Sequence, residues 1–248
     1  MSQFDEEKNN HKMVNKPIPS EVWGSFEVDE SKLRENYFNI KEKVAHYNSK
    51  IIAVTKYYGL SSILKGFEVG LRDFGESRAN DAIAKIESLP DDIRQGSNFH
   101  FIGHLQSNKV KKVVKHFDCI QSVDSLKLAE EISTCACAIN KRESVLLQVN
   151  NAKEEQKSGY SKEILLKEFD KIIALPNLEV IGLMNIAPFG ATESELRFLF
   201  SDMRKFKEEL EQQFGKKLPE LSMGMSDDYE IALQEGATMV RIGRKVFK

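Results

Sequence analysis

The feature of this 248-residue chain that most constrains its fold is an alternation of two kinds of segment that begins at residue 51. Short apolar runs alternate with longer amphipathic stretches, which is typical of successive βα units around a parallel sheet. The apolar runs predict eight strands, over residues 51–56, 72–76, 99–103, 119–124, 144–150, 179–184, 220–225 and 239–243. The amphipathic stretches predict seven intervening helices, over residues 61–70, 79–89, 107–116, 126–140, 162–175, 194–214 and 227–234.

The number of repeats favours a single closed α/β fold. Eight βα units within about 200 residues match a (β/α)8 TIM barrel, whereas an open doubly wound sheet usually has fewer strands and a glycine-rich first turn. An extra N-terminal helix is expected before the first strand, because apolar residues recur there at steps of four and three. These residues are Leu33, Tyr37, Ile40, Val44 and Tyr47. Residues 1–24 are polar and aperiodic, so we expect a flexible tail there and one barrel domain over residues 25–248.

The composition narrows the possible classes of function. Lys and Arg number 36 against 38 Asp and Glu, and this net charge of -2 argues against a nucleic-acid partner. No apolar stretch approaches the length of a membrane span, and the N-terminus lacks the apolar segment of an export signal. The three cysteines, Cys119, Cys135 and Cys137, match neither a disulfide framework nor a four-ligand zinc site. We therefore expect a cytoplasmic monomer without a metal site.

The ends of the predicted strands point to a site at one end of the barrel. In TIM barrels the active site lies at the C-terminal ends of the strands, and the eighth strand lies next to the first. Lys56 closes the first strand and Arg241 lies in the eighth, so both are candidates for one pocket. An isolated lysine at a strand end usually reaches water as an ordinary cation. A lysine that is partly removed from water can instead add its free amine to an aldehyde.

The segment after the seventh strand predicts a phosphate site. Ser222, Gly224 and Ser226 place a glycine between hydroxyl side chains just before a helix, where backbone N–H groups favour an anion. The eighth strand adds Gly243 and Arg244 next to this segment, and the loops after strands seven and eight often bind phosphate in TIM barrels. The alternative is that Ser226 only caps its helix, and two aspartates that follow it would repel a phosphate unless they face solvent.

A reactive lysine, an arginine and a phosphate site together fit pyridoxal 5'-phosphate (PLP), which carries an aldehyde, a ring nitrogen and a phosphate. Arginine does not give up its proton in proteins, so Arg241 would donate a hydrogen bond to an unprotonated ring nitrogen. An unprotonated ring is a weak electron sink, and we therefore expect weak carbanion chemistry.

Several stretches of the sequence resemble the pyridoxal phosphate homeostasis protein family over nearly the whole predicted barrel. They are AVTK at 53–56, FGE at 74–76, HFIGHLQSNK at 100–109, KSG at 157–159, GLM at 182–184, LSMGMSDD at 221–228 and VRIG at 240–243. The resemblance implies a single-domain barrel like the N-terminal domain of alanine racemase, with PLP held as an internal Schiff base on Lys56. It also implies a role in intracellular PLP homeostasis or delivery, with PLP-dependent apoenzymes as clients and no clear substrate turnover.

The resemblance further implies which residues contact the cofactor. Ser222, Ser226, Gly243 and Arg244 would lie near the phosphate and Arg241 at the ring nitrogen, while Gly224, Ser77 and Met184 complete the expected set. Two positions depart from the family pattern: Ser77 stands where the family usually has Asn, and Arg244 where it usually has Thr.

Two other functions use the same groups. A PLP-dependent racemase or decarboxylase would need a further acid or base, which alanine racemases take from another domain and subunit. A Schiff-base aldolase on a sugar phosphate would need a further lysine or acid deep in the barrel. Of the remaining polar residues, we expect His100 to be a structural histidine of its strand, His104 to lie behind the site, and Lys157 to be a second amine for transient capture of the aldehyde.

Overall fold

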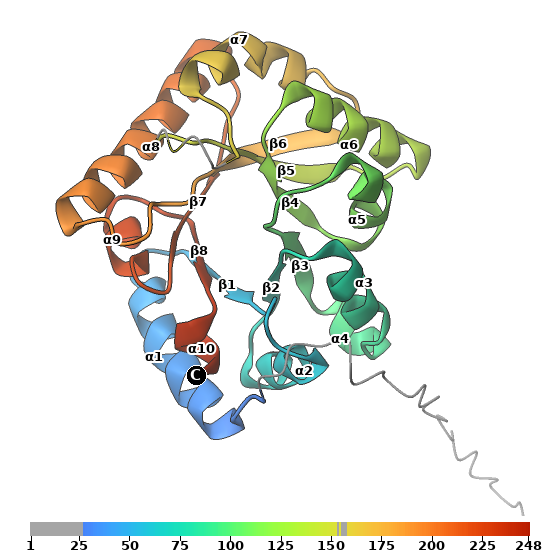
Figure 1. The fold of residues 1–248 in the computed structure, drawn as a ribbon, viewed down its shortest axis with the longest axis vertical. Coiled ribbons are helices and arrows are strands. Elements are labelled where there is room, and N and C mark those ends of the chain that lie inside the picture. The colour runs from blue at the N-terminus through green and yellow to red at the C-terminus, as the bar shows by residue number, and fades with distance from the viewer. Residues whose placement is uncertain (1–26, 153, 155–157) are drawn as a thin grey trace, which may run out of the picture.

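In the computed structural model, which describes residues 27–152, 154 and 158–248, eight parallel strands close into one barrel inside a ring of helices (Figure 1). The strands are β1 Lys50–Val54, β2 Asp73–Glu76, β3 Asn98–Phe101, β4 Cys119–Val123, β5 Glu143–Gln148, β6 Leu178–Met184, β7 Glu220–Met225 and β8 Met239–Ile242. The predicted barrel and its eight strands are confirmed. The tail predicted over residues 1–24 lies outside the described residues.

The helices also follow the prediction, with two short additions. Those that cover the barrel are α2 Leu60–Val69, α3 Ala79–Glu87, α5 Val110–His116, α6 Leu126–Ala138, α7 Lys162–Ile173, α8 Glu193–Phe214 and α9 Tyr229–Gln234. The sequence did not predict α4 Asp91–Gln95 and α10 Arg244–Phe247, which are both short. A 3-10 turn, Ser107–Lys109, precedes α5.

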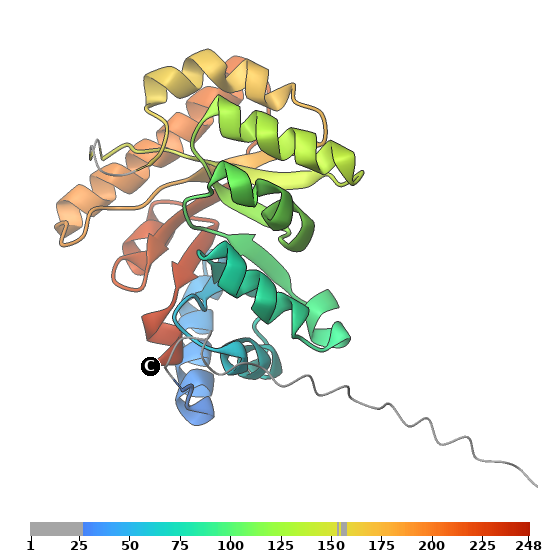
Figure 2. The same ribbon diagram turned by 45° about the vertical axis from the view of Figure 1, so that its right-hand side comes forward.

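The predicted N-terminal helix is α1 Glu30–Ala45, and it contacts α2 and α10 (Figure 2). The Asp29 side chain caps it by accepting hydrogen bonds from two backbone N–H groups of the first turn. Four of the five apolar residues that predicted the helix are buried. The fifth, Tyr47, lies beyond the helix end and is 45% exposed, so its place in the buried face was wrong.

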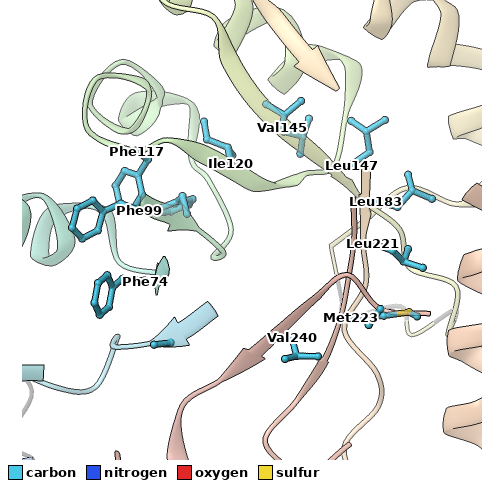
Figure 3. Close-up of a cluster of buried hydrophobic side chains, with 14 of the residues drawn as sticks. Phe74, Phe99, Phe117, Ile120, Val145, Leu147, Leu183, Leu221, Met223 and Val240 are labelled. Carbon is cyan, nitrogen blue, oxygen red and sulfur yellow. The ribbon is translucent and has the colours of Figure 1, made fainter. Parts of the chain in front are cut away.

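Alternation along the strands separates two apolar regions. Outward-facing residues pack under the helices and form the main core around the barrel (Figure 3). In β5, Val145 and Leu147 belong to this core, whereas Leu146 between them joins a small separate cluster with Cys119 and Met184. Residues on one face of each strand therefore pack against the surrounding helices, and those on the other face fill the inside of the barrel or line its ends.

The register of the closing strands decides which side chains meet at the mouth. Strand β1 pairs with β8 on one side and β2 on the other, with Ile52 opposite Arg241 and Ala53 opposite Phe74. After Val54 the chain turns towards α2, since the Tyr58 N–H donates to the Thr55 carbonyl. This adjacency of the first and eighth strands, predicted from barrel closure, is confirmed.

Candidate functional site

A cavity of about 470 Å³ opens among segments that follow the C-terminal ends of the strands. Five of the nine predicted site residues line it: Lys56, Ser226, Arg241, Gly243 and Arg244. They come from the segment after β1, from the segment after β7, from β8, and from Gly243 and the start of α10 after it. The structure therefore brings together the lysine, the buried arginine and the segments predicted to bind phosphate.

Lys56 is half-buried, and its amine has no polar partner among the described residues. Its Nζ atom lies 5.2 Å from the centroid of the Tyr57 ring, and it makes no ion pair or hydrogen bond in the part of the chain that the structure covers. A cation over an aromatic ring is weakly stabilised, so the contact leaves the nitrogen accessible. Lys56 is available for reaction with a ligand in the cavity.

Arg241 is 4% exposed and its guanidinium is held on one side only. Nη1 donates to the backbone oxygen and to Oγ of Ser222, at 2.8 and 2.7 Å, and Nη2 donates to the Asn185 carbonyl at 2.6 Å. Burial lowers the pKa of Arg241 to about 10, and the charge of Asp228 opposes this. The guanidinium therefore stays protonated at neutral pH. Its Nε–H donates to no described residue, so it can serve a ligand acceptor in the cavity.

Backbone donors line the other side of the cavity. The N–H groups of Ser226, Asp227, Gly243 and Arg244 donate no hydrogen bond to the residues that the structure describes. A Cβ atom on Gly243 would lie 3.3 Å from the Val54 carbonyl oxygen, so glycine lets this turn pass close to β1. Free N–H groups from two adjacent loops are the donors that bind phosphate groups in proteins.

The two aspartates after Ser226 have different surroundings. Asp227 lines the cavity but is 69% exposed, and its charge is paired at 2.6 Å with Arg244. Asp228 is buried; its Oδ1 accepts from the Met225 N–H at 2.5 Å, and burial raises its pKa. Helix α9 begins at Tyr229 with Asp228 in the N-cap position. The alternative in which Ser226 caps that helix is therefore wrong.

The other four predicted residues lie outside the cavity lining. Ser222 is buried beneath Arg241, and Gly224 takes a left-handed backbone conformation with φ of 89°. Met184 is completely buried inside the barrel beside Cys119. Ser77 lines a neighbouring cleft and not this cavity.

Aromatic and apolar residues that were not among the predicted site residues also line the cavity. Tyr57 and Tyr58 directly follow Lys56, and their place after a strand end was a usable signal. Tyr58 is buried against Phe247, with ring centroids 4.9 Å apart, and burial raises its pKa. Ile102, which follows β3 in the same way, also lines the cavity, and so does Phe189, which lies in a loop without such a signal.

Three further predictions concern polar residues. His100 is buried and hydrogen-bonded through both ring nitrogens, to Asp73 and Gln121, as expected of a structural histidine. The His104 side chain is 62% exposed and lines the cleft that contains Ser77. Lys157 lies outside the described residues.

In the part of the chain that is described, no helix could span a membrane and no acidic, His or Cys side chains group as metal ligands do.

Comparisons with known proteins agree with this geometry. The family described as alanine racemase, N-terminal domain, matches residues 28–248. The pyridoxal phosphate homeostasis protein of Synechocystis sp. is 40% identical over 198 residues, which are 80% of this chain and 90% of the relative. PipY of Synechococcus elongatus PCC7942, solved with PLP bound, has a TM-score of 0.80 and 37% identity, covering 87% of this chain and all of that one.

The racemases themselves are more distant. An alanine racemase of Clostridium difficile is 16% identical with a TM-score of 0.73, and the match covers 88% of this chain but 57% of the racemase. A similarity at this level of identity shows that the barrel fold is shared and does not indicate a shared activity.

Proposed function

This chain belongs to the pyridoxal phosphate homeostasis proteins within the alanine racemase N-terminal domain family, and from that membership we propose that it holds PLP reversibly on Lys56 and releases it to other proteins. The observation that carries the proposal is the arrangement of two groups in one cavity. An amine without a polar partner lies in the same cavity as a buried arginine that keeps one N–H free. The residues present fit the three functional groups of PLP.

The covalent step uses only Lys56 and the aldehyde. Lys56 would supply the amine that holds PLP, and the aldehyde would supply a carbon that condenses reversibly with an amine, with release of one water molecule. Water reverses the step and returns both partners unchanged. A site that holds its ligand by this reaction can therefore bind tightly and still release it.

Arg241 favours a protein that binds PLP over one that uses PLP to convert a substrate. Its guanidinium is protonated at neutral pH and has only donors, so it favours a ring nitrogen that is an acceptor. A ring with an unprotonated nitrogen stabilises a substrate carbanion poorly. The N–H groups of Ser226, Asp227, Gly243 and Arg244 supply the phosphate contacts.

The wider role follows from the same site. The protein acts as a cytoplasmic monomer that passes PLP to PLP-dependent apoenzymes. Neither nucleic acid nor membrane is part of this role. The racemase and aldolase hypotheses are less well supported, because each needs a second reacting group for which the sequence offers no convincing candidate.

The proposal is tested by absorption spectra of the purified protein with PLP, before and after borohydride, followed by peptide mapping. We expect an imine band that borohydride converts to a stable adduct on Lys56 and that Lys56→Ala removes. The matched control is Lys127→Ala, which removes an exposed lysine far along the chain on α6 and should keep the band. Label spread over several surface lysines, or a band that persists in Lys56→Ala, would contradict the proposal.

A further inference from the structure

A chain of hydrogen bonds runs from Arg241 through the inside of the barrel. Nη1 of Arg241 lies 2.7 Å from Oγ of Ser222, and this Oγ lies 2.7 Å from Oε1 of Gln121. Nε2 of Gln121 lies 3.1 Å from Nδ1 of His100, and Nε2 of His100 lies 3.1 Å from Oδ1 of Asp73. The first four residues are at most 5% exposed. A continuous polar path thus starts at the candidate site and ends at the beginning of β2.

The path crosses the barrel instead of following its wall. Its members lie on β8, β7, β4, β3 and β2, and β4 is not a neighbour of β7 in the sheet. TIM-barrel interiors are mostly filled by branched apolar side chains. A buried polar path in such an interior is costly unless each member has its hydrogen bonds, and here each link is made.

The chemistry of the members gives the path one direction of donation. Arginine only donates, so the Ser222 oxygen accepts from Arg241 and the Ser222 hydroxyl donates onward to the carbonyl oxygen of Gln121. The Gln121 amide nitrogen then donates to Nδ1 of His100. Nδ1 is therefore the acceptor, and the proton on Nε2 of His100 is donated to Asp73.

Two further contacts are made along the path, one at its Asp73 end and one at Gln121 in its middle. Asp73 also accepts from Asn98 at 3.1 Å; although burial raises the pKa of Asp73, its hydrogen bonds lower it below the ordinary value, so it remains a charged acceptor. The second hydrogen on Nε2 of Gln121 points to Sδ of Met239 at 3.6 Å. With both ends of the amide engaged, Gln121 has one orientation that satisfies all of its partners.

We infer that Gln121 and His100 are positioning residues for Arg241, although neither lines the cavity. By orienting the Ser222 hydroxyl they hold Nη1 on the barrel side, which leaves Nε–H for the ligand. This inference rests on the proposed function and adds residues to it. If Gln121 loses its amide, the Ser222 hydroxyl is free to rotate and the guanidinium loses one fixed anchor.

The test compares two ligands that differ only at the ring nitrogen: PLP and N-methyl-pyridoxal 5'-phosphate. The methyl group removes the acceptor lone pair and leaves a positive charge beside Arg241. We expect the wild-type protein to bind PLP more tightly, and we expect Gln121→Met to reduce this ratio of affinities roughly tenfold, the effect of one hydrogen bond to a charged group. His100→Phe should reduce it less, because His100 lies one link further away. Arg241→Gln removes the guanidinium, so it shows the ratio of affinities that remains when the contact to the ring nitrogen is lost.

Leu146→Met is the matched control, since it also places a methionine inside the barrel and changes no residue of the path. It should keep the wild-type ratio. An unchanged ratio in Gln121→Met with a normal circular dichroism spectrum would overturn the inference, as would a wild-type protein that binds both ligands equally. If Gln121→Met does not fold, His100→Phe decides by the same ratio. Failure of the proposed function is a separate result: no borohydride-trapped adduct on Lys56 with either ligand.

Discussion

Two lysines lie near the C-terminal end of β1 in opposite states. Lys85, on α3, is 2% exposed; its Nζ donates to the Thr55 carbonyl at 2.9 Å and to Oε1 of Glu76 at 2.7 Å. Lys56, the residue after Thr55, is half-buried and has no polar partner among the described residues. The same side chain is a structural cation in one place and an available amine in the other.

The difference shows that the partners decide the chemistry of a lysine more than its burial does. The deeper lysine is the less available for reaction, because its Nζ already donates to a backbone carbonyl and to a carboxylate. Glu76 also accepts from the Thr55 hydroxyl at 2.8 Å, so the pair ties β2 and α3 to the residue that directly follows β1. The structural lysine thereby holds in place the backbone that carries the available one.

The largest test of this comparison removes the structural lysine. Lys85→Met should lower the free energy of unfolding by about 3–5 kcal/mol, because it leaves Glu76 buried without its cation. Urea unfolding followed by circular dichroism measures the loss. Lys56→Met is the matched control, and we expect it to change stability by less than about 1 kcal/mol, since it breaks no polar contact. Similar losses in both variants would contradict the division of roles.

A second test applies the same comparison to two buried carboxylates, Glu76 and Glu143. Glu143, in β5, is fully buried like Glu76, but its Oε1 has no hydrogen-bond partner among the described residues. The Lys141 ammonium lies 2.6 Å from Oε2 yet directs its N–H groups to the carbonyls of Val114 and Phe117. Burial raises the pKa of Glu143 from 4.5 to about 7, and Lys141 only partly opposes this.

This pKa predicts how stability depends on pH. The folded protein binds a proton at Glu143 more tightly than the unfolded chain does, so this contribution to stability is complete below pH 4.5 and is lost as the pH rises to about 7. Glu143→Gln should remove that slope and raise the free energy of unfolding at pH 8 by up to about 3 kcal/mol. Urea unfolding at pH 5 and pH 8 measures it, and an unchanged slope in the variant would contradict the prediction.

The comparison also explains what the sequence could predict. The pattern of apolar runs identified the barrel, and barrel closure placed Lys56 and Arg241 in one cavity, because strand order alone fixes that adjacency. A strand end does not reveal which face its last side chain takes. Met184 therefore proved to point into the barrel, and Ser77 to line a neighbouring cleft.

Partners across the barrel were beyond the sequence pattern for a different reason. The pairing of Ser222 with Gln121 joins residues 101 positions apart on strands that are not neighbours, and a register shift between β7 and β8 changes which side chains of β7 face inward. The state of each lysine could not be predicted either, because no local rule links Glu76 to Lys85 rather than to Lys56.

Arg244 is an intermediate case between the two lysines, and it gives the smallest expected effect. Its guanidinium is 62% exposed and paired at 2.6 Å with Asp227, which lines the same cavity. A phosphate in the cavity would compete with that carboxylate for Arg244. Exposed ion pairs contribute little to stability, so the competition should be weak and reversible.

Asp227→Asn should therefore tighten PLP binding about two- to fivefold, because it frees Arg244 for the phosphate and removes a nearby negative charge. Pyridoxal, which lacks the phosphate, should bind the variant and the wild-type protein equally. Absorbance titrations of the imine band measure both ligands. In an Arg244→Thr background the gain for PLP should shrink, since only the removal of repulsion remains. An equal gain in both backgrounds, or an equal gain for pyridoxal, would show that Arg244 behaves like the structural lysine and does not respond to the ligand.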